Sequence, residues 1–205
     1  MIDRPEVDDE QYFRDIMDRY SVPTATQDEL FEKLDRGVAW DANDPTAAPV
    51  SVETNDALGK SETVKRYEDG SIAVLSVQQP AATDGIMPRR WLGCGYTVHR
   101  STYNTVDDCF VDWTRGTTKM KFAVDAEIWH SGRDKILRAH TGSYRYAQGC
   151  ASASLSVNRK TESTSGAPAR ASMVMDGDIL CAGGGRSYTL VIEVGNDRFS
   201  HTADF

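Results

Sequence analysis

The stretch Lys119-Met120-Lys121-Phe122-Ala123-Val124-Asp125-Ala126-Glu127-Ile128 decides the fold class of this chain. Apolar side chains occupy every second position from Met120 to Ile128, and the positions between them carry a lysine, an alanine and two acids. Successive side chains of a strand point to opposite faces of a sheet, so this alternation predicts a strand with one buried face. We expect the charged residues to line a solvated face and not to serve as the carboxylate pair of a glycosidase.

Similar alternation recurs on both sides of this stretch. Gly132, Gln148-Gly149, Asp176-Gly177 and Gly195-Asn196-Asp197 are the expected turns. Seven or eight short strands within about 115 residues predict an antiparallel sandwich or barrel, and we adopt the sandwich. The expected strands are 94–99, 108–113, 119–128, 135–146, 150–158, 169–175, 187–194 and 198–203.

The cysteines lie within this β region. There are four of them, Cys94, Cys109, Cys150 and Cys181, and no C-x-x-C pair that would suggest a zinc ribbon or a thioredoxin-like site. An even number in a turn-rich region favours disulfides over four buried thiols. Of the three pairings that four cysteines allow, we predict Cys94–Cys109 and Cys150–Cys181, because both pairs bracket short sheet-like stretches.

Residues 9–37 are predicted to form two short helices. Helical spacing of apolar residues from Tyr12 to Tyr20 predicts the first, with Asp8 or Asp9 as its N-cap. The second is expected to open with a capping box of Thr26 and Glu29 and to end at Gly37. Their narrow apolar stripes should pack together or against a sheet, with Trp40 filling the contact.

A connector and a hairpin are expected to follow the helices. Residues 41–61 are polar and contain two prolines, which predicts a connector. Asp69-Gly70 lies between strand-like residues 63–67 and 72–77, as in a tight β-hairpin. A second connector, 79–88, marks the boundary of the main domain. The predicted division is 1–48 (acidic helical hairpin and connector), 49–88 (β-hairpin and linker) and 89–205 (β-sandwich).

The net charge of −8 arises from the N-terminal quarter of the chain. Residues 1–50 hold 13 acids and 5 bases, whereas the remaining residues hold 18 of each. Because no segment has a large basic excess, nucleic acid is not an expected partner. The longest apolar runs are far shorter than the 18 residues of a membrane span, so no membrane association is expected either.

Catalytic and cofactor motifs are missing from the sequence. There is no G-x-S-x-G, no H-E-x-x-H and no complete P-loop around Gly59-Lys60-Ser61. Asp176-Gly177-Asp178 lacks the further ligands of a calcium loop and is interpreted as a hairpin turn. His99, with Asp107 and Asp108 near it, is interpreted as a surface histidine. We therefore predict no catalytic residue, no metal site and no cofactor.

Exposed aromatic residues are the remaining candidates for a binding site. Trp129, Tyr144 and Tyr146 are the predicted ligand-binding residues, because aromatic rings stack on sugars and anchor protein partners. The alternative is that these rings fill the core.

Several short pieces of the front half resemble a known group of proteins. They are Tyr20–Pro23, Leu30–Leu34, Gly37–Asp41, Pro49–Ser51 and Tyr67–Ser71. Residues 10–80 resemble secreted actinobacterial proteins of unknown function, which carry a cysteine-bearing β region behind this part. The resemblance implies export and a two-part layout, and it implies no activity.

These observations predict a secreted, non-enzymatic binding protein whose partner is an extracellular protein or a glycan. Met1-Ile2-Asp3-Arg4 is followed by acids and not by the apolar region of a signal peptide, so we expect that a signal has been removed and that Met1 was added or retained for expression. One alternative is an extracellular hydrolase with a dispersed site. Another is a secreted enzyme inhibitor that presents a disulfide-braced loop such as 101–107.

Overall fold

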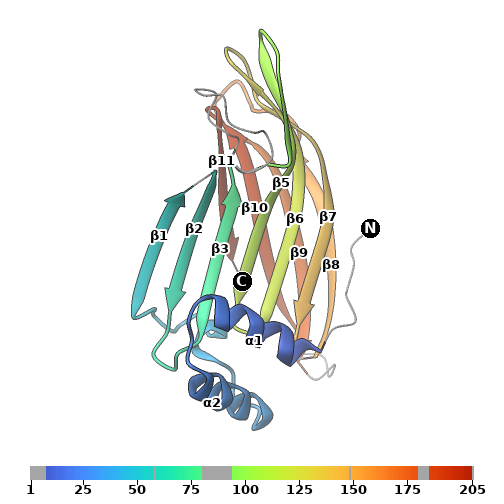
Figure 1. The fold of residues 1–205 in the computed structure, drawn as a ribbon. Helices are drawn as coiled ribbons and strands as arrows, with labels where there is room; N and C mark the ends of the chain where they lie inside the picture. The colour runs from blue at the N-terminus through green and yellow to red at the C-terminus, as the bar shows by residue number, and fades with distance from the viewer. Residues whose placement is uncertain (1–7, 58, 80–93, 148, 180–184, 205) are drawn as a thin grey trace.

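The protein is a two-sheet β-sandwich with two helices at its front end (Figure 1). The structure is a computed structural model and describes residues 8–57, 59–79, 94–147, 149–179 and 185–204. Strands account for 57% of the chain, and all paired strands among the described residues are antiparallel. The predicted fold class is confirmed.

The first sheet has seven strands and the second has four. The first follows the order β1-β2-β3-β5-β6-β7, with β4 paired to β5, and the second follows β11-β10-β9-β8. The first sheet contains β1 (Ser51–Ala57), β2 (Lys60–Arg66), β3 (Ile72–Gln78), β4 (Tyr96–His99), β5 (Tyr103–Arg115), β6 (Thr118–Trp129) and β7 (Lys135–Tyr146). The second contains β8 (Gly149–Arg159), β9 (Ala169–Ile179), β10 (Arg186–Gly195) and β11 (Arg198–Asp204).

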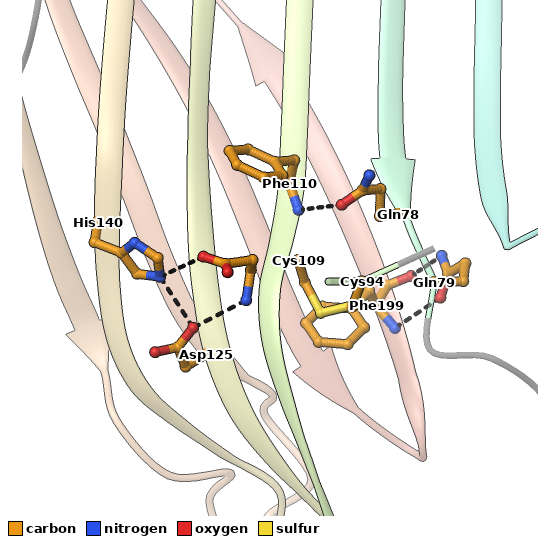
Figure 2. Close-up of a disulfide and its surroundings, with 9 residues drawn as sticks. Gln78, Gln79, Cys94, Cys109, Phe110, Asp125, His140 and Phe199 are labelled. Carbon is orange, nitrogen blue, oxygen red and sulfur yellow. Dashed lines mark hydrogen bonds and ion pairs between the residues drawn. A yellow bond between two sulfur atoms is a disulfide. The ribbon is translucent and has the colours of Figure 1, made fainter. Parts of the chain in front are cut away.

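The core lies between the two sheets and follows the alternation read from β6. Met120, Phe122 and Val124 are fully buried and belong to one cluster with Met173 and Leu190 of the second sheet. Polar contacts also join the sheets at one corner. The side-chain amide of Gln79 donates to the Phe199 carbonyl at 2.8 Å, and the Phe199 N–H donates back at 3.2 Å (Figure 2).

Residues 51–57 form a strand, so the prediction of an unbroken connector over 41–61 is wrong. β1 pairs with β2 along its whole length but lies at the edge of the sheet, and Val52 is more than half exposed. An edge strand with solvent on both faces needs no apolar alternation, which removes the periodicity by which strands are recognised. A turn of 3₁₀ helix, Asp41–Asn43, occupies the start of the expected connector.

Asp176 and Gly177 lie inside β9, so the hairpin turn predicted there is wrong. The glycine at position 177 is required by the packing of a neighbouring side chain and not by a reversal of the chain. A Cβ built on Gly177 would lie 2.9 Å from Cζ of Tyr146, so only glycine leaves room for this buried ring.

We expect Gly177→Val to lower the free energy of unfolding by about 1–3 kcal/mol, because it overpacks a filled site. Ser156→Val, at an exposed position of β8, is the matched control and should change stability by less than about 0.5 kcal/mol. Urea denaturation of both variants measures the difference. Equal stabilities would show that the Tyr146 ring moves aside without cost.

Two helices precede the sheets, α1 (Asp9–Arg19) and α2 (Thr24–Asp35). Asp8 is the N-cap of α1, and its carboxylate accepts from the Glu10 N–H at 3.0 Å. The capping box predicted at Thr26 and Glu29 is wrong, because α2 begins two residues earlier, after Pro23. Gly37 does end α2: it has φ of 74°, and the amides of Gly37 and Val38 donate to the carbonyls of Leu34 and Lys33, as in a Schellman motif.

α1 crosses the outer face of the seven-stranded sheet, on the side away from the second sheet, and α2 lies beside α1 at one end of the strands (Figure 1). Phe13, Ile16 and Met17 of α1 meet Leu30 and Phe31 of α2, with Ile72 and Val74 of β3 below them. Trp40 is 1% exposed within this cluster, and its indole N–H donates to the Leu30 carbonyl at 2.6 Å. The expected packing of the helices and of Trp40 is confirmed.

The predicted hairpin around Asp69-Gly70 is confirmed by the pairing of β2 with β3. Gly70 has φ of 82°, a left-handed conformation that favours glycine. β3 also pairs with β5, so the hairpin strands continue the same sheet as the strands after residue 102. Most of the expected boundary, 79–88, lies outside the described residues.

One of the two predicted disulfides is confirmed, because Cys94 is bonded to Cys109. Cys150 is also disulfide-bonded, and Cys181 lies outside the described residues, so the second pairing stays a prediction. The prediction of a loop at 101–107 is wrong for most of its length, since Tyr103–Asp107 belong to β5 and each of these residues pairs with β4, with β6 or with both.

Candidate functional site

A pocket of about 290 Å³ lies on the outer face of the seven-stranded sheet, where the end of α1 crosses it. The floor comes from side chains of β2, β3, β5 and β6, all of which point away from the second sheet. Its lining residues are Ile16, Arg19, Tyr20, Lys60, Val74, Ser76, Gln78, Phe110, Asp112, Thr114, Lys119 and Lys121.

Positive charge dominates this pocket. Its lining contains the basic residues Arg19, Lys60, Lys119 and Lys121, but Asp112 is the only acid among them. The whole chain, in contrast, has a net charge of −8. Cationic side chains gathered in a concave, partly enclosed site attract an anion more strongly than the same charges spread over a surface.

Two bases of the pocket form described ion pairs, Lys60 and Lys119, and Lys119 is the less exposed of the two. Its side chain is 12% exposed and forms an ion pair with Asp112, which is 25% exposed. Burial lowers the pKa of Lys119, and Lys121 and Arg19 act in the same direction, whereas Asp112 opposes them. Lys119, Lys121 and Arg19 therefore share the single carboxylate of Asp112, and the net positive charge that remains can attract a bound anion.

Tyr20 fixes the end of α1 beside the pocket. Its hydroxyl donates to Glu62 at 3.0 Å, and its carbonyl accepts from Arg66 at 2.8 Å. Glu62 also forms an ion pair with Lys60 at the rim. Burial, together with the negative charge of Glu62, raises the pKa of the Tyr20 phenol, so this group remains a neutral donor.

Phe110 supplies an aromatic surface at the other end of the pocket. The Lys121 ammonium lies 4.2 Å from its ring centroid. The backbone N–H of Phe110 donates to the Gln78 side-chain carbonyl at 2.9 Å (Figure 2). This contact fixes the amide of Gln78, which lines the same pocket.

A second polar cluster, formed by Asp108, Asp125 and His140, lies farther along the same sheet face. Nε2 of His140 is 2.9 Å from Oδ1 of Asp125 and 3.6 Å from Oδ1 of Asp108, and Figure 2 shows the imidazole of His140 pointing toward Asp125. Asp108 has φ of 53° in a β-bulge, and its N–H donates to Asp125 at 3.0 Å. Their ligand atoms lie within 4.8 Å of one another, close enough to hold a metal ion.

Asp125 is 4% exposed, so its predicted place on a solvated face is wrong. Bulges in β5 and β7 bring Asp108, Arg138 and His140 over it, and the sequence pattern of one strand contains no sign of its neighbours. Burial acts to raise the pKa of Asp125, but the Asp108 amide, Arg138 and His140 together hold it below its usual range.

This cluster makes stability depend on pH in a defined direction. Because its folded-state pKa is depressed, Asp125 stabilises the fold above its unfolded pKa of about 3.9, and this contribution is lost as the pH falls through the folded pKa. Asp125→Asn should therefore destabilise the protein by about 1–3 kcal/mol at pH 7 and show a weaker loss of stability between pH 5 and 2.

Asp107→Asn is the control for this prediction. Burial and the neighbouring Asp125 and Asp108 raise the pKa of Asp107, so removing its charge should stabilise the fold at pH 7. Urea unfolding of both variants at a series of pH values tests the pair. A parallel pH profile for Asp125→Asn and the wild type would contradict the assignment.

The aromatic residues predicted as ligand-binding do not form one site. Tyr146 is 2% exposed and packs on Tyr188, so it is a core residue and its prediction as an exposed ring is wrong. Tyr144 is half-buried and donates to the Ala151 carbonyl at 3.0 Å. Trp129 stacks on Tyr103, with their ring centroids 4.8 Å apart. Tyr144 pairs with Met120, which is nine residues before Trp129 in β6, so about 30 Å of strand separates Trp129 from Tyr144.

The pocket residues were not singled out from the sequence as a site. The alternation of β6 did place Lys119 and Lys121 on its polar face, and this is the only sign of them that the sequence contains. The His99 side chain lies outside what the structure describes, and Asp108 is found beside His140 instead.

The fold and the pocket define a helix-capped, disulfide-bearing β-sandwich with a cationic cavity on its outer face. No family model matches the chain, and no curated protein is similar to it. A crystal structure of hypothetical protein lmo2686 from Listeria monocytogenes EGD-e matches 71% of this chain and 94% of its own, with 18% identity and a TM-score of 0.36. So distant a likeness supports no inference about function. Among the described residues, neither helix could cross a membrane.

Proposed function

We propose that this chain is a secreted, non-enzymatic binding protein and that its pocket binds an acidic sugar. The observation that carries the proposal is that four basic residues and one acid line a concave site. A structural disulfide fits an extracellular protein, since such bonds persist in oxidising compartments.

The other lining groups suit a sugar better than a bare ion. Ser76, Gln78 and Thr114 offer hydroxyl and amide groups, and Phe110 offers a ring on which the apolar face of a sugar can stack. The pocket volume of about 290 Å³ suits a ligand of monosaccharide size. Basic side chains beside them recognise a carboxylate.

The hydrolase alternative is supported only by the contact of His140 with Asp125. The described residues that line the pocket include no histidine, and the one carboxylate there is paired with Lys119. The binding function therefore accounts for more of the structure.

The proposal predicts selective binding of methyl α-galacturonoside over methyl α-galactoside, which differs only in carrying a hydroxymethyl group in place of the carboxylate. Lys121→Met should weaken binding of the acid by about 10- to 150-fold, because a charge-assisted hydrogen bond contributes about 1.5–3 kcal/mol. Isothermal titration calorimetry measures both affinities. Lys65→Met, at an exposed position of β2 outside the pocket, should leave them unchanged.

Binding of neither sugar, or equal binding of both, would contradict the proposal. Affinity for the acid should also fall as ionic strength rises, since the attraction is electrostatic. An affinity for the acid that is independent of salt would contradict the role of the basic residues.

A further inference from the structure

We propose that Lys119 captures the ligand covalently, forming an imine with the open-chain aldehyde of an acidic reducing sugar. This inference rests on the proposed function and deepens it, because it names the reactive group that the ligand carries. A uronic acid bears both features in one molecule: a carboxylate for the basic residues, and a masked aldehyde at its reducing end.

The position of Lys119 supports this role. Its side chain extends from β6 into the pocket with only 12% of its surface exposed, and Asp112 is its ion-pair partner. Lys121 is two residues along the same strand face, about 7 Å away, and Arg19 of α1 lines the pocket as well. Lysines that react with carbonyls are commonly desolvated and placed beside another cation.

The electrostatic balance also favours the reactive form of the amine. Burial lowers the pKa of Lys119, and the repulsion from Lys121 and Arg19 adds to the effect. The attraction of Asp112 opposes it. A larger fraction of Lys119 is therefore the neutral amine than for a lysine in water, and only the neutral amine has the lone pair needed to attack a carbonyl.

Asp112 is placed to move the protons of this reaction. Its carboxylate takes a proton from the Lys119 ammonium, and Nζ then attacks the aldehyde carbon. Transfer of a second nitrogen proton to the oxygen gives a carbinolamine. The proton held by Asp112 returns to this hydroxyl, the C–O bond breaks, and water leaves. The products are a protonated imine and one water, so charge and atoms balance and no oxidant or reductant is consumed.

The test is reductive trapping of the intact protein with galacturonic acid and sodium cyanoborohydride, followed by peptide mapping by mass spectrometry. We expect the adduct to form on Lys119 at least about tenfold faster than on Lys65 and Lys135, two more exposed lysines that serve as internal references. Galactose, which has the aldehyde but no carboxylate, should label Lys119 more slowly.

Methyl α-galacturonoside separates covalent capture from simple binding, because it retains the carboxylate and cannot open to an aldehyde. It should form no adduct and should protect Lys119 from galacturonic acid. Lys119→Arg keeps the positive charge beside Asp112 but cannot form the imine, so it should abolish labelling at this position. Peptide mapping of the wild type remains decisive if this variant does not fold.

Labelling of Lys119 no faster than that of Lys65 and Lys135, in a protein that binds methyl α-galacturonoside, would overturn the inference and leave the proposed function intact. Failure to bind methyl α-galacturonoside at all would overturn the proposed function. Rapid labelling by galactose as well would show a reactive lysine without selection for acids, and this too would overturn the inference.

Discussion

Trp40→Ala is expected to lower the free energy of unfolding by about 3–5 kcal/mol, the usual cost of deleting a large buried aromatic residue. Trp40 is 1% exposed and belongs to the buried cluster that joins the two helices to β3. Its ring meets Phe31 edge to face at 5.3 Å. Its N–H satisfies the Leu30 carbonyl, so the substitution removes a hydrogen bond together with the packing.

The measurement is urea unfolding followed by far-ultraviolet circular dichroism, with Val38→Ala as the control. Val38 is 48% exposed, only two residues from Trp40, and its truncation should change stability by less than about 0.5 kcal/mol. A loss below about 1 kcal/mol for Trp40→Ala would show that the two helices contribute little to the cooperative fold.

Removal of the Cys94–Cys109 disulfide should cost about 3 kcal/mol, the second largest effect that we expect. The bond closes a loop with a sequence separation of 15 residues, and its loss gives the unfolded chain more conformations. Cys109 is fully buried beside the bulge that carries Asp108, so the double variant Cys94→Ala/Cys109→Ala also leaves a small void in the core.

Urea unfolding of the double variant against the oxidised wild type measures this cost. The variant should keep the near-ultraviolet circular dichroism of its aromatic core, since β4, which follows Cys94, pairs with β5, and β5, which contains Cys109, also pairs with β3 and β6. A stability equal to that of the wild type would contradict the entropic argument. Loss of the native signal altogether would show that the bond is required for folding.

Much of the sandwich could be predicted because strand alternation is a local property. The pattern from Met120 to Ile128 correctly predicts which side chains enter the core, since each residue of a half-buried strand faces either the second sheet or away from it. Asp8 and Gly37 could likewise be assigned from the sequence, because caps act on backbone groups within a few residues.

Features that depend on neighbours distant in the chain could not be predicted. β1 lacks an apolar face because it is an edge strand, and Gly177 is glycine because Tyr146 lies over it. Both facts concern pairing and packing between residues far apart in sequence. The polar face of β6 was identified correctly, but the sequence contains no sign that α1 would cover one part of it and that bulges would bury Asp125 in another.

The sequence by itself determined the class of the protein: a disulfide-bearing antiparallel sandwich behind two short helices. Each of these features is encoded by residues close together in the chain, through alternation, capping or cysteine spacing. Only the tertiary structure decided where a ligand could bind. The pocket joins Arg19 of α1, Lys60 of β2, Asp112 of β5 and Lys119 of β6, and the chain must fold before these charges can share one small volume.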